Sequence, residues 1–242
     1  MMSPSSSTPR VQLRFAIVLA LVACAAGARF VPYLVSDDSA LKPLLWNFSP
    51  VVAIALFGGA RFASRWAAFL VPLLIMLISD LALHLLDAAP ITNGWELLQQ
   101  GTTYLVLVLV SGMGVSLQGL ENRWAGVAGT GWRARIRSLA VKTGLIGSAT
   151  VLSAVVFFLV SNFVVWLTAS ATMPPEFQYP KTLAGLLDCY VKALPFFRGT
   201  FWGNIYYAGL LFGGFEIAQI AVPGLRSTPR EPALAMAGQA TP

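Results

Sequence analysis

The sequence predicts an all-α membrane protein with six transmembrane helices, and three observations lead to this fold class. Of the 242 residues, 57% are hydrophobic and only 11% are charged, whereas an ordinary soluble domain carries about 25% charged residues. The mean hydropathy of +0.71 excludes both a soluble globular enzyme and a disordered chain. Apolar runs long enough for a membrane span of about 20 residues recur along the chain, with only short loops between them.

The apolar runs define the predicted elements in order: 13–34, 50–62, 66–86, 101–119, 143–168 and 199–222. Together they form one membrane domain, 13–222, and the polar tails 1–12 and 223–242 are predicted to be disordered. The second run is short, although Ser49-Pro50 is a favourable helix start. A helix this short crosses the membrane only with tilt, or dips into it and returns.

Charge sets the predicted topology. The net charge is +6, but the basic residues flank apolar runs, so we expect membrane lipid and not nucleic acid as a partner. Eleven of the 16 Lys and Arg residues fall on the side of the N-terminus, which predicts that both termini are cytoplasmic. The inner loop 120–142 carries Trp124 and Trp132. It is interpreted either as an interfacial segment on anionic lipid or as a docking surface for a cytoplasmic partner.

Cysteines and catalytic motifs give few signals. Cys24 and Cys189 cannot form a disulfide framework or a four-cysteine zinc site. The stretch Leu21–Cys24 resembles a lipoprotein processing signal, but such patterns also occur inside true spans, and both interpretations stay open. The sequence lacks a phosphate-binding loop and the hydrolase and zinc-peptidase motifs, so we expect no catalytic residue, no cofactor and no metal.

Two charges are expected at the same membrane depth. Arg29 lies about 22 Å along the first span and Asp80 about 21 Å along the third, and both spans run in the same direction. We expect a buried ion pair that acts as a structural clamp. The alternative is that each side chain reaches the outer interface separately.

Asp80, His84 and Asp87 share one helix face, because they are spaced four and three residues apart. This spacing suits a metal or proton site, and a polar end to the third span explains it equally.

A substrate pocket is predicted on the outer side, where aromatic rings accompany a few amides. The candidate residues are Asn47, Asn162, Trp166, Tyr190, Arg198 and Asn204. An aromatic belt at the membrane surface is the alternative. Residues 181–194 form an amphipathic pattern, which predicts a surface helix that serves as a lid or lies on the bilayer.

Several segments carry a resemblance. They are Arg29–Pro32, Asn47–Gly59, Val71–Asp80, Ser161–Phe163 with Trp166, Tyr179–Leu187 with Cys189 and Tyr190, Pro195–Arg198, and Leu211–Gly214. Over about residues 14–222 the chain resembles a bacterial family of six-span proteins of unknown function labelled putative transport proteins. The resemblance implies multi-pass insertion in the bacterial cytoplasmic (inner) membrane.

That family in turn resembles the substrate-binding S components of energy-coupling factor transporters. This likeness implies an S-component-like helical bundle with an outward pocket for a micronutrient-like solute. It also implies that Ala16 and Ala20, which match an alanine ridge on the first span, dock a separate coupling transmembrane subunit that works with ATPases. The identity of the solute does not carry over.

The expected function is therefore capture of a small solute from the outer side for uptake. Two alternatives from other classes remain open. One is a membrane scaffold for envelope biogenesis that binds proteins through residues 120–142. The other is a membrane enzyme that uses Asp80, His84 and Asp87.

Overall fold

The computed structural model describes residues 8–36, 39, 45, 47–86, 94–125, 131–169, 177–222 and 225. Within these ranges all regular secondary structure is helical. The elements are α1 (Thr8–Gly27), a 3-10 turn (Ala28–Phe30), α2 (Val31–Leu34), α4 (Val51–Arg61), α5 (Arg65–Leu85), α6 (Gly94–Ala125), α7 (Trp132–Thr168) and α8 (Leu183–Ala221). The predicted all-α class is confirmed.

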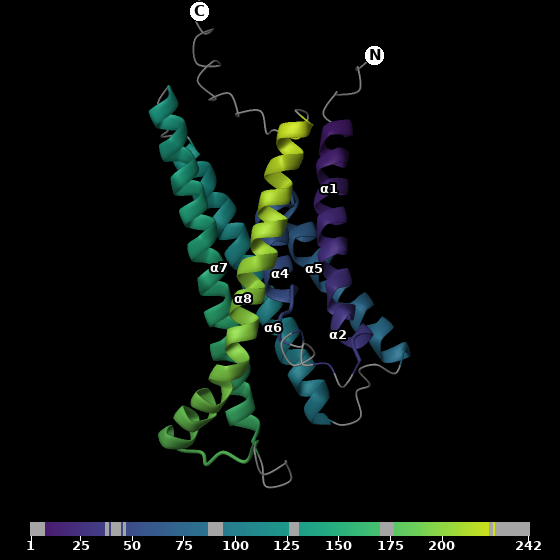
Figure 1. The fold of residues 1–242 in the computed structure, drawn as a ribbon, viewed down its shortest axis with the longest axis vertical. Coiled ribbons are helices and arrows are strands. Elements are labelled where there is room, and N and C mark those ends of the chain that lie inside the picture. The colour runs from purple at the N-terminus through teal and green to yellow at the C-terminus, as the bar shows by residue number, and fades with distance from the viewer. Residues whose placement is uncertain are drawn as a thin grey trace, which may run out of the picture.

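The long helices run between two ends of the molecule in alternating directions (Figure 1). We call one the termini end, where α1 begins, α4 finishes and α8 finishes. We call the other the distal end, where α2 finishes, α4 begins and α8 begins. The first described turn of the chain and the last turn of α8 therefore lie at the same end of the bundle.

Four stretches of the described chain are long and apolar enough to cross a membrane: Gln12–Leu34, Arg65–Leu85, Gly94–Trp124 and Trp132–Thr168. A fifth apolar helix, Val51–Arg61, is shorter. These lengths and compositions support the expectation of a helical membrane protein, because a span needs about 20 apolar residues.

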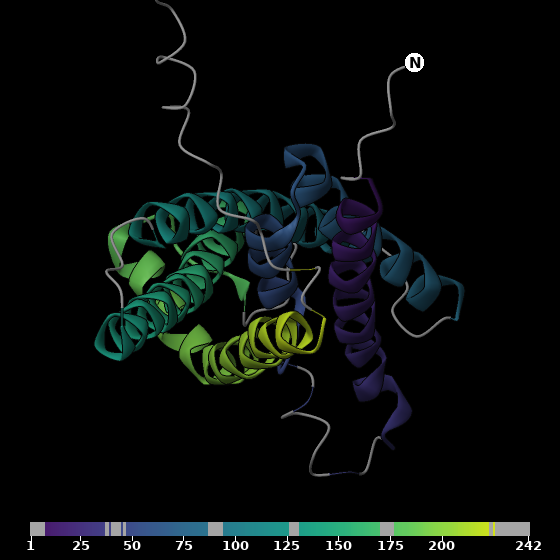
Figure 2. The same ribbon diagram turned by 90° about the horizontal axis from the view of Figure 1, so that it is seen from above.

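The short helix α4 forms the core of the bundle. All of its residues, from Val51 to Arg61, are buried, and α1, α5, α6, α7 and α8 all contact it (Figure 2). Its closest neighbour is α6, since a Cβ added to Gly59 would lie 2.2 Å from the Ser111 carbonyl oxygen. A Cβ on Gly114 would lie 2.3 Å from the Leu56 carbonyl oxygen. Glycine therefore allows the two backbones to touch.

Four helices extend beyond the predicted spans. The first, α1, begins at Thr8, so residues 8–12 of the tail for which the sequence predicts disorder are helical. Residues 120–125 continue α6, and α7 begins at Trp132, so most of the described part of the predicted inner loop is helical. The surface helix predicted at 181–194 and the span predicted at 199–222 form one helix, α8, with Pro195 inside it. Thr182 caps its start by accepting a hydrogen bond from the Gly185 amide, at 3.2 Å. The first turns of α8 are set at an angle to the rest (Figure 1).

Candidate functional site

Arg29 and Asp80 form an ion pair at the distal end. Arg29 lies in the 3-10 turn that follows α1, and its Nη2 is 2.5 Å from Oδ1 of Asp80 on α5. The Arg29 Nη1 donates to the Ser79 hydroxyl and, at 3.5 Å, to the Met76 carbonyl. The two charged side chains are 16% and 11% exposed. The pair that the helix depths predict is therefore present, joining the end of α1 to α5.

The Asp80 carboxylate is also held by α6. Gln100 donates its amide to Oδ2 at 2.7 Å, and the Tyr104 hydroxyl donates to the same oxygen at 2.6 Å. A carboxylate has two acceptor oxygens, and here Arg29, Gln100 and Tyr104 all donate to them. The cluster thus ties α1, α5 and α6 at one point.

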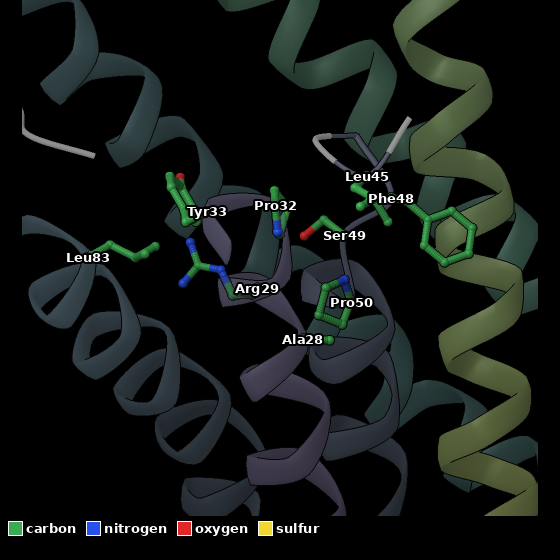
Figure 3. A pocket seen from close by; sticks show the side chains of 9 residues that line it. All are labelled: Ala28, Arg29, Pro32, Tyr33, Leu45, Phe48, Ser49, Pro50 and Leu83. Atoms are coloured by element: carbon green, nitrogen blue, oxygen red, sulfur yellow. The ribbon is translucent and has the colours of Figure 1, made fainter. Parts of the chain in front are cut away.

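A cavity of about 110 Å³ lies beside Arg29 (Figure 3). Its lining comes from the 3-10 turn after α1, from α2, from the segment before α4, and from α5. The residues are Ala28, Arg29, Pro32, Tyr33, Leu45, Phe48, Ser49, Pro50 and Leu83. Figure 3 shows the Ser49 hydroxyl directed towards the side of the cavity that holds Pro32 and Arg29. The lining thus includes one guanidinium and two hydroxyl-bearing residues among apolar side chains, and its accessible surface is more polar than apolar.

The segment that carries the cavity wall is fixed to α8. A Cβ on Gly199 would lie 2.7 Å from the Asn47 Cβ, and one on Gly203 would lie 3.1 Å from the Phe48 backbone. The Phe48 ring packs against the rings of Tyr206 and Tyr207 at centroid distances of 5.4 and 5.5 Å. Because the two glycines lack side chains, the segment that contains Asn47 and Phe48 can pack directly against the backbone of α8.

Three of the predicted substrate residues meet where α7 finishes and α8 begins, outside the cavity lining. Asn162 donates to the Phe158 carbonyl at 2.8 Å, and the Tyr190 hydroxyl donates to the Leu159 carbonyl at 2.9 Å. The Trp166 indole donates to the Pro180 carbonyl at 2.9 Å. These bonds hold a packed corner around Tyr179 and Cys189. Burial raises the pKa of the Cys189 thiol and of the Tyr179 hydroxyl.

The other predicted substrate residues lie elsewhere. Asn204 is fully buried and donates to the Thr150 carbonyl at 2.7 Å and to the Ser153 hydroxyl at 3.0 Å, which joins α8 to α7. Arg198 is exposed on α8, and Asn47 packs on Gly199. The structure therefore distributes the six residues over several places, and none of them lines the cavity.

The face of α5 that suits a metal site is only partly described. Asp80 is engaged as above, His84 is exposed, and Asp87 lies outside the described residues. Across the described chain, no group of three His, Cys, Asp or Glu residues is placed to hold a metal ion.

The small residues differ in their surroundings. Ala16 and Ala20 are exposed on α1, as is Cys24. On α8, a Cβ on Gly209 or Gly213 would meet nothing within 4 Å. These two glycines therefore make no close helix contact in the described chain, whereas Gly199 and Gly203 do.

A second charge cluster, at the termini end, is one that the sequence reasoning missed. Arg61 at the end of α4 forms a bidentate pair with Glu121 of α6, at 2.6 and 3.0 Å. The Arg61 guanidinium lies over the Phe212 ring, 4.7 Å from its centroid. Arg14 donates from Nε and Nη2 to the Arg61 carbonyl at 3.3 and 3.2 Å.

The signal for this cluster was present in the sequence. Arg61 ends an apolar run that has no polar face, so its side chain needed a buried carboxylate. The topology prediction uses Arg61 only as one of the eleven basic residues on the side of the N-terminus.

A family model described as a family of unknown function (DUF6580) matches residues 9–225. Comparisons with curated proteins and with solved structures give no match. Because the matched region covers nearly all of the described bundle, the chain belongs to the family of unknown function DUF6580.

Proposed function

We propose that this chain is a six-span protein of the bacterial inner membrane that binds a small solute in the Arg29 cavity for uptake. The observation that carries the proposal is the cavity itself, which places a guanidinium beside aromatic and proline walls at one end of an apolar helical bundle. In small-molecule sites, a few polar groups orient the ligand beside apolar and aromatic side chains.

The proposed topology places both termini in the cytoplasm, so the distal end and its cavity face outwards. It is supported by the alternating helix directions (Figure 1) and by the excess of Lys and Arg near the termini end. Alkaline phosphatase fused after residue 226 should be inactive, and fused near residue 175 it should be active. The reverse pattern would contradict this orientation.

The cavity restricts the chemistry of the solute. Its volume of about 110 Å³ is below the roughly 150 Å³ of an engineered protein cavity that binds benzene. Arg29 donates hydrogen bonds and cannot accept them, while Phe48 and the two prolines offer apolar contacts. The solute we propose is therefore small and carries one hydrogen-bond-accepting group, such as a carboxylate or carbonyl, on an apolar body.

Uptake itself is proposed from the resemblance to S components. In this hypothesis a separate coupling subunit with its ATPases docks on α1 at Ala16 and Ala20. The exposure of both alanines is compatible with such a contact. The enzyme hypothesis has less support, because Asp80 gives both carboxylate oxygens to Arg29, Gln100 and Tyr104.

The test is native mass spectrometry of the purified protein with its co-purified small molecules. Ala28→Phe places a ring in the cavity, whereas Ala23→Phe makes the same change at an exposed position of α1, just before the turn that holds Ala28. We expect wild type and Ala23→Phe to carry the same small-molecule adduct and Ala28→Phe to lose it. An adduct that persists in a folded Ala28→Phe variant would place the site elsewhere.

A further inference from the structure

The start of α7 extends beyond the apolar part of its helix. With 37 residues, α7 is about 54 Å long, whereas a bilayer with its headgroups is about 40–45 Å thick. The apolar part, 143–168, alone covers about 38 Å, more than the hydrocarbon core of about 30 Å. The first eleven residues, 132–142, therefore lie at or beyond the headgroup layer of the termini end.

This segment has an exposed apolar face. Trp132, Ile136 and Leu139 are 67%, 58% and 65% exposed, and their spacing of four and three residues puts them on one side of the helix. Ala134 and Ser138, on the other side, are half-buried, in a helix that packs along α6. The exposed apolar side chains and the half-buried Ala134 and Ser138 therefore lie on opposite sides of this segment.

Arginines flank the apolar face. Arg133 and Arg137 lie four residues apart on one flank, and Arg135 lies on the other. All three are exposed, and the Arg133 guanidinium lies 5.4 Å from the Trp132 ring centroid. Within the described chain, the carboxylates at this end are Glu121 and Glu216. They pair with Arg61 and Lys142. Arg133, Arg135 and Arg137 therefore have no carboxylate partner among the described residues at this end.

We propose that residues 132–139 bind anionic phospholipid, with the arginines on the phosphate groups and Trp132, Ile136 and Leu139 between the acyl chains. Two observations favour lipid over a protein partner. The exposed side of the helix continues through Thr143 and Gly147 into the start of the predicted span. The arrangement of an aromatic and aliphatic stripe between arginines is typical of helices that lie at a membrane surface.

The end of α6, which packs against α7, carries a similar pattern. Leu120 and Trp124 are exposed four residues apart, and Arg123 lies beside them. A tryptophan next to an arginine thus occurs on both helices of the hairpin, as expected where a membrane interface crosses it. This inference is independent of the solute cavity, which lies at the opposite end.

The experiment is a titration of the purified full-length protein in detergent with phosphatidylglycerol, followed by native mass spectrometry. Phosphatidylcholine, which has no net charge, serves as the lipid control. We expect the combined variant Arg133→Gln, Arg135→Gln, Arg137→Gln to bind phosphatidylglycerol at least about tenfold more weakly, because each arginine near an anionic surface contributes severalfold. Binding of phosphatidylcholine should not change.

Two further variants make the result specific. Replacing the same three arginines by lysine keeps the charge and should keep binding within about threefold of wild type. Ile136→Ser with Leu139→Ser keeps the arginines but should also weaken phosphatidylglycerol binding, and free glycerol phosphate should not displace the lipid. All substituted positions are exposed, so the melting temperature should stay that of wild type.

Wild-type phosphatidylglycerol binding by the folded glutamine variant would overturn the proposal. Displacement of the lipid by glycerol phosphate would overturn it too, because it would show a simple phosphate site. Loss of an acidic protein partner from the glutamine variant, with unchanged lipid binding, would assign the surface to protein instead.

Discussion

The two ends of the bundle each hold an arginine–carboxylate pair, and the pairs differ in their surroundings. At the distal end, Arg29 borders a cavity, and Asp80 is shared among donors from three helices. At the termini end, Arg61 makes a bidentate pair with Glu121, and aromatic rings of α8 cover it. The first pair is placed where a solute can reach it, and the second is enclosed. We infer that the enclosed pair serves stability alone, while the other serves stability and the proposed site.

The enclosed pair should be the most costly to break. Glu121→Gln leaves the Arg61 guanidinium without its carboxylate, and Arg61 is only 4% exposed. We expect a loss of about 3–5 kcal/mol in the free energy of unfolding, the usual cost of an uncompensated buried charge. Denaturant titration in micelles measures it. A loss below that of Asp80→Asn would contradict the comparison.

The glycine contact beside the enclosed pair comes next. Gly114→Ala would place a Cβ 2.3 Å from the Leu56 carbonyl oxygen, which belongs to backbone and cannot rotate away. Overpacking of this kind costs about 1–3 kcal/mol. Gly112→Ala on the same helix is the matched control, because its Cβ meets nothing within 4 Å. The same titration should separate the two variants, and equal stabilities would mean that α4 and α6 do not touch here.

Breaking the Arg29–Asp80 pair beside the cavity should lower the free energy of unfolding by less than breaking the enclosed pair. Asp80→Asn and Arg29→Gln are each expected to cost about 1–3 kcal/mol, the range for an unsatisfied buried group, because the cavity lets water replace the lost partner. The double variant should recover part of the summed losses in a double-mutant cycle. Strictly additive losses would show that the two side chains are not coupled.

The smallest effect is expected for the shared hydrogen bonds of Asp80. Tyr104→Phe removes one of the donors to Oδ2 and leaves Gln100 and Arg29 in place. We expect a loss of about 0.5–1.5 kcal/mol, measured by the same denaturant titration. A loss as large as that of Asp80→Asn would show that Tyr104, and not Arg29, is the main partner of the carboxylate.

The sequence predicted the fold class and the Arg29–Asp80 pair, because both depend on simple periodic rules. Apolar run lengths indicate helices, and equal depths on parallel helices brought Arg29 and Asp80 together. Depth alone did not pair Arg61 with Glu121, because the chain position of a charge at a helix end does not say whether its side chain points inwards.

The site was harder to predict than the fold. Asn162, Trp166 and Tyr190 are near one another, but they bond to carbonyls of α7 and of the segment before α8. From sequence alone, an amide that donates to a carbonyl of its own helix cannot be distinguished from one that binds a ligand. The cavity instead depends on the close packing of the segment before α4 against Gly199 and Gly203. Only the three-dimensional packing of α8 distinguishes these two glycines from Gly209 and Gly213.

The complete burial of α4 has a consequence for biosynthesis. Its eleven residues cover about 16 Å, roughly half of the hydrocarbon core, so alone in lipid its ends would leave backbone groups without hydrogen-bond partners. Most of the helices that surround it, α5, α6, α7 and α8, are made after it. We therefore expect α4 to stay protected at the insertion machinery, or to enter as a hairpin with α5, and to reach its final position only once α8 has emerged from the ribosome. A chain shortened before α8 would then be recognised by membrane quality-control proteases even though its first helices are already inserted.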